Sequence, residues 1–369
     1  MPNKKITLPK KDLSFFKSLI DMPSPTGFES KWQHIRTSYI KRYVDDIYVD
    51  SYGTAVGIIN PKAKYKVVIE AHCDEISRFV NYITDDGYIH VIRNGGSDHM
   101  IAPSQRVLIH TNSGDSVPGV IWRPAIHTRR WEGMIDDIPQ VKQITIDVCA
   151  KDKKAVLKMG INIGDTITYD SSFQVLNKKR YTWRAMDNRV GGFMIAQVAR
   201  LLKQNKKTLP FWLYIVNSVQ EEIGLRWAEM IAEWIKPDIA IVTDVCHDTG
   251  TPMISKQIEW DTICGSGPVL TVWPAVQNNV LRHIQKTAKK NKIPVQMNAV
   301  SYFTGTDTDA FAYSNQWVPS ALISLATRYM HSTVETVHHD DICNTIDLIY
   351  KSVLAIKNGK DWGYDILKK

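Results

Sequence analysis

Four stretches of the chain are almost wholly apolar, and each leads directly into polar side chains. They are Lys66–Ala71, Phe211–Val216, Ile239–Val242 and Val318–Leu325. Apolar runs of this length, rich in β-branched residues, are typical of strands buried on both faces of a parallel sheet. The polar residues that follow them are therefore predicted to lie at the carboxyl ends of the strands.

Apolar residues also recur at helical spacing in four places. These are Leu13, Phe16 and Ile20; Trp32, Ile35 and Tyr39; Val190, Met194, Val198 and Leu201; and Ile342, Ile346, Ile349 and Val353. Such spacing places the apolar side chains on one face of a helix. The alternation of strands and helices predicts an α/β fold, a sheet flanked by helices, with its ligand site at the carboxyl ends of the strands.

Residues 78–180 have a different pattern. Short β-like segments such as Tyr88–Ile92, Arg106–His110 and Val117–Trp122 are separated by Gly, Asn, Asp and Pro. We expect a small β-barrel or sandwich inserted into the α/β domain. The predicted catalytic domain then comprises residues 1–77 and 181–369.

Composition narrows the class of protein. The chain has 369 residues, of which 44% are hydrophobic and 23% charged, as is ordinary for globular domains. No apolar run reaches the roughly 18–20 residues of a membrane span. The formal net charge of +8 comes from scattered basic residues without a nucleic-acid-binding motif, so we expect neither a nucleic-acid nor a membrane partner. Five widely spaced cysteines, with no Cys-x-x-Cys pair, predict reduced thiols and a cytoplasmic protein.

Acidic and histidine side chains follow the predicted strands or precede a predicted helix. They are His72, Asp74, Asp187, Glu221, Glu222, Asp244 and His331. Several of them also have a purely structural interpretation. His72 could be a hydrogen-bonded structural residue, Asp187 could cap a helix, and the two adjacent glutamates could lie on a solvated face. Taken together, two imidazoles and several carboxylates suit two borderline metal ions, zinc or cobalt, better than calcium or magnesium.

Such a set has a recognised chemistry. Two metal ions about 3.5–4 Å apart polarise a carbonyl group and lower the pKa of a bridging water. A carboxylate that binds no metal then takes the proton from that water and passes it to the leaving amine. A further acid orients a histidine ligand through its second ring nitrogen, a role that fits Asp74, two residues after His72.

Two further polar motifs do not require a bound phosphate or metal to explain them. Gly265–Pro268 resembles a phosphate loop only superficially, since no convincing helix follows, and is better explained as a turn that lines the substrate site. His338-His339-Asp340-Asp341 directly precedes the last predicted helix, and we expect it to cap that helix rather than bind a metal.

Several motifs, in order along nearly the whole chain, resemble those of the TET-type, or deblocking, aminopeptidases, a family of dinuclear metallopeptidases that includes glutamyl aminopeptidases and endoglucanase-like relatives. The segments are Pro23–Glu29, Ala71–Ile76, Met159–Asp165, Met186–Arg189, Gln220–Gly224, Val242–Asp244, Gly305–Ala310 and Met330–Glu335. Departures such as Cys73 and Ala185 leave every expected ligand in place.

The resemblance implies roles for individual residues. His72, Asp187 and Asp244 would bind one metal, and Asp187, Glu222 and His331 the other, with Asp187 as the bridge. Glu221 would be the general base. It also implies the dinuclear zinc exopeptidase type of fold, peptide substrates, and a homo-oligomer such as a dodecamer, in which the inserted domain contacts other subunits.

We therefore predict a metal-dependent aminopeptidase. The alternatives are another dinuclear amidohydrolase, such as a carboxypeptidase or acylase, and a catalytically silent assembly protein of the same fold. The complete ligand set argues against the silent protein, and a glucanase needs two spaced carboxyl groups rather than two metals. A carboxylate cluster suits the α-amine of a substrate and repels a C-terminal carboxylate, unless a cation such as Arg189 counters it.

Overall fold

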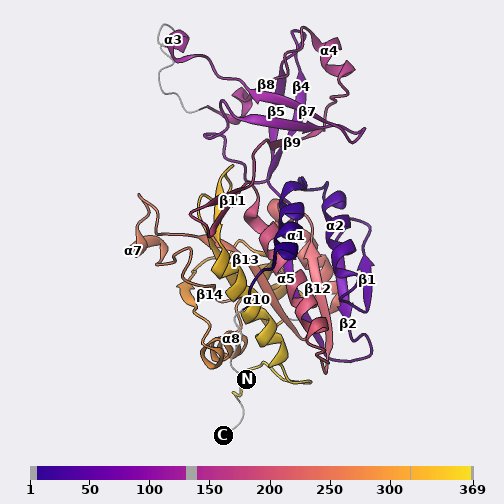
Figure 1. The fold of residues 1–369 in the computed structure, drawn as a ribbon, viewed down its shortest axis with the longest axis vertical. Coiled ribbons are helices and arrows are strands. Elements are labelled where there is room, and N and C mark those ends of the chain that lie inside the picture. The colour runs from indigo at the N-terminus through magenta and orange to yellow at the C-terminus, as the bar shows by residue number, and fades with distance from the viewer. Residues whose placement is uncertain (1–5, 130–138, 316, 367–369) are drawn as a thin grey trace. The chain divides into compact units, whose positions relative to one another are not determined.

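The computed structural model describes residues 6–129, 139–315 and 317–366. By their contacts the described residues fall into two compact units. The larger comprises residues 6–74, 173–330 and 334–366, and the smaller comprises residues 75–172 and 331–333. Figure 1 shows their elements coloured along the chain.

An eight-stranded mixed sheet forms the centre of the larger unit. Its order is β1 (Asp46–Val49), β2 (Ala55–Ile59), β12 (Trp212–Ser218), β3 (Lys66–His72), β13 (Ile239–His247), β16 (Ser320–Thr327), β14 (Val269–Val272) and β15 (Gln296–Ala299). The four adjacent strands β12, β3, β13 and β16 run parallel to one another. They are the four apolar stretches of the sequence, so the predicted α/β fold is confirmed.

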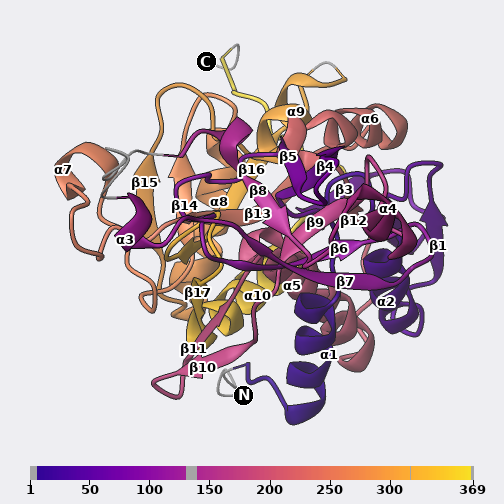
Figure 2. The same cartoon turned by 90° about the horizontal axis from the view of Figure 1, so that it is seen from above.

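Helices cover both faces of this sheet (Figure 2). On one face, α5 (Met186–Gln204) packs on the central strands. Three helices contact α5: α1 (Lys10–Asp21), α2 (Ser30–Ile40) and α10 (His339–Leu354). A further helix, α8 (Asn278–Asn291), packs against α10. On the other face, α6 (Arg226–Ile235) contacts β12, while α9 (Asp307–Tyr313) contacts β13 and β16. The short helix α7 (Lys256–Glu259) and a three-stranded sheet of β10 (Gln174–Leu176), β11 (Arg180–Trp183) and β17 (Glu335–His338) complete the unit.

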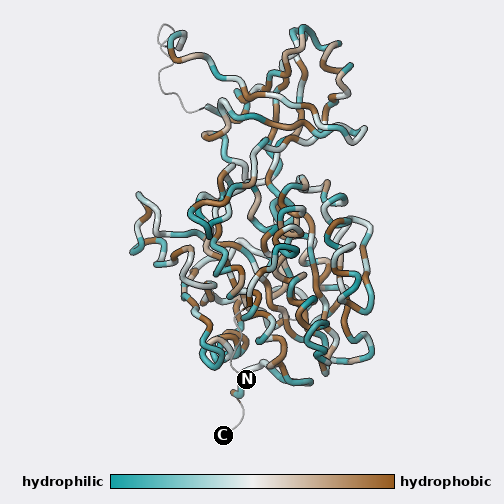
Figure 3. Tube along the Cα trace, viewed as in Figure 1, coloured by the Kyte–Doolittle hydropathy of each residue, from teal (hydrophilic) through white to brown (hydrophobic). Residues whose placement is uncertain are grey.

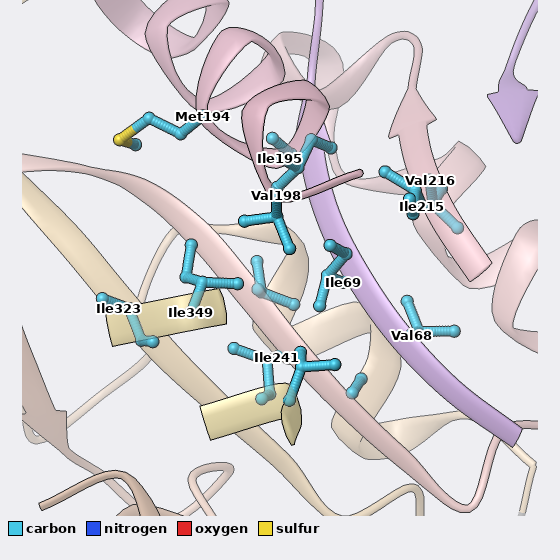
Figure 4. Close-up of a cluster of buried hydrophobic side chains, with 14 of the residues drawn as sticks. Val68, Ile69, Met194, Ile195, Val198, Ile215, Val216, Ile241, Ile323 and Ile349 are labelled. Carbon is cyan, nitrogen blue, oxygen red and sulfur yellow. The ribbon is translucent and has the colours of Figure 1, made fainter. Parts of the chain in front are cut away.

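The main hydrophobic core lies between α5 and the central strands. Figure 4 shows Met194, Ile195 and Val198 of α5 above side chains from the parallel strands, with Ile349 of α10 beside them. Val198 is fully buried, as is Ile69 of β3. At about 25 cal/mol per Å² of buried apolar surface, burial of such side chains is the main force that holds α5 on the sheet.

The smaller unit is a closed antiparallel barrel. Its strand order is β4 (Ser77–Ile83), β5 (Ile89–Asn94), β8 (Thr145–Asp147), β7 (Ser116–Ile121), β6 (Arg106–His110) and β9 (Thr166–Tyr169), and β9 closes on β4. The short helices α3 (Ile126–Arg129) and α4 (Lys153–Lys158) and a 3₁₀ turn, η1 (Val141–Gln143), lie in its connections. Buried residues such as Val91 and Ile109 form a separate small core. The expected inserted β fold is thus a barrel rather than a sandwich.

The hydropathy of the residues differs between the strands and the loops that connect them (Figure 3). Brown, hydrophobic segments mark the central strands, whereas the connecting loops are mostly teal. No helix among the described residues is long and apolar enough to cross a membrane.

Candidate metal centre

The carboxyl ends of the central strands bring the predicted site residues together. His72 is the last residue of β3, Asp244 lies within β13, and Glu221 and Glu222 form the 3₁₀ turn η2 (Glu221–Ile223) after β12. Because these strands are adjacent and parallel, their carboxyl ends share one edge of the sheet. Asp187 reaches the same place from the start of α5.

His72 is at the centre of this group. It is almost completely buried, and its Nε2 lies 3.1 Å from Asp187 Oδ1 and 3.7 Å from Asp244 Oδ1. A third carboxylate oxygen, Glu221 Oε2, is 3.9 Å from the same nitrogen. Burial lowers the pKa of His72, but the surrounding carboxylates, Glu221 first among them, outweigh it and raise the pKa well above its usual value.

This arrangement fits a metal site. One ring nitrogen carries at most one proton, which cannot satisfy three buried carboxylates, and buried charges of one sign require a compensating cation. The structure contains two groups of three residues whose donor atoms, within each group, all lie within 4.8 Å of one another. The first group is His72, Asp187 and Glu222, and the second is His72, Glu221 and Asp244. Nitrogen and carboxylate donors at such spacing are the ligands that zinc and similar ions prefer.

Asp74 holds both the histidine and the glutamate turn. Its Oδ1 lies 3.3 Å from His72 Nδ1, which leaves the other ring nitrogen for the carboxylate cluster. The same carboxylate accepts hydrogen bonds from the backbone N–H groups of Glu221 (3.0 Å) and Glu222 (3.2 Å). Asp74 is completely buried, so its position is fixed by these contacts.

The two glutamates differ in exposure. The side chain of Glu221 is buried, whereas Glu222 is half-buried. Burial raises the pKa of Glu221 well above its usual value, and the negative charge of Glu222 adds to this effect while His72 opposes it. A carboxylate with a raised pKa is suited to accept a proton near neutral pH.

Asp187 does not cap helix α5. Helix α5 has Ala185 at its N-cap, and Asp187 has non-helical backbone angles inside the first turn. The peptide bond between Asp187 and Asn188 is cis. The backbone N–H of Asp187 donates to Glu335 Oε2 (3.0 Å), and its carboxylate faces His72. The neighbouring Asn188 fills the capping position, because its Oδ1 accepts the Gly191 N–H (3.1 Å).

Comparison with known proteins agrees with this geometry. The family model of the M42 glutamyl aminopeptidases matches residues 53–348. The chain belongs to this family. It is a metallo-aminopeptidase, a hydrolase that removes N-terminal residues from peptides.

Individual relatives are similar along most of their length. The lysyl aminopeptidase of Pyrococcus furiosus is 30% identical, with 91% of this chain and 95% of the relative covered. The structure of the aminopeptidase APDkam598 from Desulfurococcus kamchatkensis is 31% identical over 93% of this chain and 94% of that chain, with a TM-score of 0.86. The TET1 peptidase of Pyrococcus horikoshii, which can assemble into a tetrahedron or a large octahedral shell, is 25% identical over 94% of this chain and 99% of that chain, with a TM-score of 0.79.

His331 belongs by its contacts to the barrel unit of this M42 aminopeptidase. Its backbone is left-handed, with a φ of 60°. A Cβ atom added to Gly96 would lie 3.1 Å from the His331 ring, so a side chain at residue 96 would crowd the imidazole. The role of His331 as a ligand stays a prediction.

The two remaining motifs of the M42 chain have structural roles. The His338 side chain accepts a hydrogen bond from the Asp340 N–H at the start of α10, so the predicted cap is confirmed. Asp341 accepts the N–H groups of Gly265 (2.5 Å) and Gly267 (2.7 Å), and the turn leads into strand β14 rather than a helix. The segment therefore lacks the helix that follows a phosphate loop. Its place as a turn that lines the substrate site stays a prediction.

Three residues that hold the site were not assigned roles from the sequence. Thr26, Glu29 and Glu335 are buried and bond to site residues or to the backbone beside them. Each lies within a family-like motif, but a single sequence does not reveal which distant backbone group a buried acid will meet. Burial and the neighbouring Asp74 carboxylate raise the pKa of Glu29 to about 8.

Proposed function

We propose that this aminopeptidase binds two divalent metal ions at the centre around His72. His72, Asp187 and Asp244 would hold one ion, and Asp187, Glu222 and His331 the other, so that Asp187 bridges the pair. The main support for the proposal is that carboxylate oxygens of Asp187, Glu221 and Asp244 lie 3.1–3.9 Å from His72 Nε2. Mixed imidazole and carboxylate ligands favour zinc or cobalt over calcium or magnesium.

Two such ions, when bound, would polarise the scissile carbonyl and lower the pKa of a water molecule. Glu221 Oε2 takes a proton from the attacking water and delivers it to the leaving amine. The burial of Glu221 and the 3.9 Å distance from its Oε2 to His72 Nε2 support this role. Asp74 keeps the His72 ring in the orientation that leaves Nε2 for the cluster.

The roles of the two glutamates can be separated by replacing each in turn. Glu221→Gln is expected to keep the fold and both metals while kcat falls by about 10²–10⁴, the usual contribution of a general base. Glu222→Gln is the matched control and is expected to lose about one metal equivalent, because it removes a ligand. Elemental analysis gives the metal content. Loss of a full equivalent in Glu221→Gln would make Glu221 a ligand and reverse the two roles.

Metal identity and specificity can be measured together. Protein stripped of metal is reloaded with zinc, cobalt or manganese and then tested on a panel of aminoacyl chromogenic substrates. We expect no activity in the stripped protein, and the highest activity with zinc or cobalt. Full activity without metal would contradict the dinuclear proposal.

We propose that the substrate's free α-amine is recognised by the carboxylate cluster. The centre holds five acidic side chains, Asp74, Asp187, Glu221, Glu222 and Asp244. When ionised they carry one negative charge more than two divalent ions offset, so the site would attract an amine and repel a C-terminal carboxylate. Arg189, the cation nearest in sequence, is fully buried and donates to Ile20 O (2.6 Å) and Ser24 Oγ (3.1 Å), which argues against its use as a carboxylate receptor.

Acetylation of a good peptide substrate tests this recognition. The change removes the charge of the amine and leaves the scissile bond intact, so hydrolysis is expected to fall by orders of magnitude. Release of C-terminal residues first in a mass-spectrometric time course would instead support a carboxypeptidase.

We also propose that the inserted domain, predicted from the sequence at residues 78–180, mediates contact between subunits of a homo-oligomer such as a dodecamer. The assembly of the Pyrococcus horikoshii TET1 peptidase supports this proposal. A cytoplasmic location is proposed as well, supported by five free cysteines, because reduced thiols are usual in that compartment.

A further inference from the structure

One loop bonds to three of the segments that carry the proposed ligands. This loop, residues 23–29, connects α1 to α2 and contains none of the ligands itself. Ser24 Oγ donates to the carbonyl oxygen of Cys73 (2.7 Å), between His72 and Asp74. The same hydroxyl accepts a hydrogen bond from Arg189 Nε (3.1 Å), two residues after Asp187.

The second half of the loop reaches the glutamate turn. Thr26 Oγ1 donates to Asp74 Oδ2 (2.9 Å), the carboxylate that accepts the N–H groups of Glu221 and Glu222. Glu29 Oε1 accepts the N–H of Gln220 (3.3 Å) and the N–H of Gly27 within the loop (2.7 Å). Two buried carboxyl groups thus receive three successive backbone N–H groups, from residue 220 to residue 222.

These contacts matter because the turn has no regular structure to fix it. Gln220 has a left-handed backbone, with a φ of 59°, and η2 is a single 3₁₀ turn. Thr26 and Glu29 are each only 2% exposed, so water does not replace their hydrogen bonds at low cost. A shift of about 1 Å in a catalytic group can lower the rate about 100-fold.

We propose that Glu29 and Thr26 are positioning residues that set the orientation of Glu221, Glu29 through the Gln220 amide and Thr26 through Asp74. The inference rests on the proposed role of Glu221 as general base. Neither residue is a proposed metal ligand. Their effect is expected on kcat, because they govern where the base lies and not how the substrate binds.

Replacement of Glu29 tests the proposal. Glu29→Ala is expected to lower kcat about 10- to 100-fold, with KM within about twofold of wild type and both metals retained. Glu29→Gln keeps an oxygen that can accept the Gln220 N–H, so it should restore most of kcat. The matched control is Asp50→Ala, which removes a carboxylate that accepts the N–H groups of Tyr52, Gly53 and Thr54 away from the site and should leave kcat unchanged.

A double-mutant cycle with Glu221→Gln shows whether Glu29 acts through the base. If it does, Glu29→Ala has no further effect on kcat in the Glu221→Gln background. An equal loss of kcat in both backgrounds, or unchanged kcat in Glu29→Ala alone, would overturn the proposal. Inactive wild-type enzyme would instead count against the proposed function itself, so the two failures are distinguishable.

Thr26→Val serves if Glu29→Ala does not fold. It has nearly the same shape and removes only the hydroxyl that donates to Asp74. The expected result is again a lower kcat with unchanged metal content, and the loss should disappear in the Glu221→Gln background. A lower melting temperature with wild-type kcat would assign the loop a purely structural role and reject the inference.

Discussion

Single buried carboxylates decide how the M42 site is held together. Asp74 receives two backbone N–H groups and the Thr26 hydroxyl, and it also faces His72 Nδ1. Its charge therefore acts on the histidine ring and on the glutamate turn at once. Glu335 has a comparable role toward the backbone of Asp187.

Replacing Asp74 with Asn keeps the shape and removes the charge. Oδ1 lies beside His72 Nδ1 and accepts the Glu221 N–H, whereas Oδ2 accepts the Glu222 N–H and the Thr26 hydroxyl. The amide has one accepting oxygen where the carboxylate has two, so one of these two sets of contacts is lost. We expect metal affinity or kcat to fall by about 10- to 100-fold, as for other residues that orient metal ligands. Metal titration and steady-state kinetics measure the two quantities. Asp165→Asn, at a buried carboxylate of the barrel that accepts the Asn162 N–H, is the control and should change neither.

His283 is expected to contribute to acid sensitivity. Burial lowers the pKa of its imidazole from 6.5, and the nearby Lys360 and Lys286 lower it further. The contact of Nε2 with the Ser352 carbonyl oxygen (3.0 Å) opposes this effect without reversing it. Because the folded pKa is the lower one, the unfolded chain binds more protons below about pH 6.5. Stability from the neutral ring is thus present above that pH and is lost as the pH falls toward the folded pKa.

His283→Gln should weaken this pH dependence. Urea unfolding of metal-loaded wild type and variant, at about pH 7.5 and about pH 5.5, gives the free energy of unfolding on either side of the usual histidine pKa. The difference between the two pH values is the stability that each protein loses. We expect a smaller loss in the variant than in wild type. Equal losses would show that other groups account for the acid sensitivity.

At the scale of elements, the close packing of α5 on β3 fixes the start of the helix that carries Asp187. A Cβ atom on Gly191 would lie 2.2 Å from Asn188 Oδ1 and 2.9 Å from Ala71 Cβ. Asn188 in turn donates to the Thr243 carbonyl oxygen, one residue before Asp244. A glycine is therefore required where the helix, β3 and β13 meet.

Gly191→Ala is expected to disturb this junction. Overpacking of a tight core usually costs about 1–3 kcal/mol of stability. The displaced Asn188 should also move Asp187, so metal content should fall together with the melting temperature. Ala199→Gly, at a fully buried site farther along α5, is the control: it costs helix stability but should leave metal content unchanged.

The elements themselves were largely predictable from the sequence. The four apolar stretches correspond to β3, β12, β13 and β16 within a few residues, because strands buried on both faces leave an uninterrupted apolar signal. The antiparallel strand β2, which pairs with β12, and the order of the strands were not predictable, since they depend on contacts between distant segments. Likewise, adjacency of Glu221 and Glu222 did not reveal which side chain is the more buried.

At the scale of the whole molecule, the proposed role of the barrel in subunit contact leads to a prediction about its outer surface. A closed barrel has no free strand edges, so any contact must use side chains on its outer surface. Several large apolar side chains lie there: Val120 at the end of β7 is 45% exposed and Trp122 just beyond it is 50% exposed. Alternation along the chain places both on the side opposite to buried Ile121.

We expect the double variant Val120→Glu, Trp122→Glu to dissociate the oligomer. Charged side chains on an apolar contact surface oppose association, because their desolvation is unfavourable, while the barrel core beneath remains intact. Light scattering should show an assembly much larger than the 42.0 kDa chain for wild type and a smaller species for the variant. Met253→Glu, at a fully exposed apolar residue of the larger unit, is the control and should leave the assembly unchanged. A wild-type enzyme that is fully active as a monomer at micromolar concentration would reject a role of the barrel in assembly.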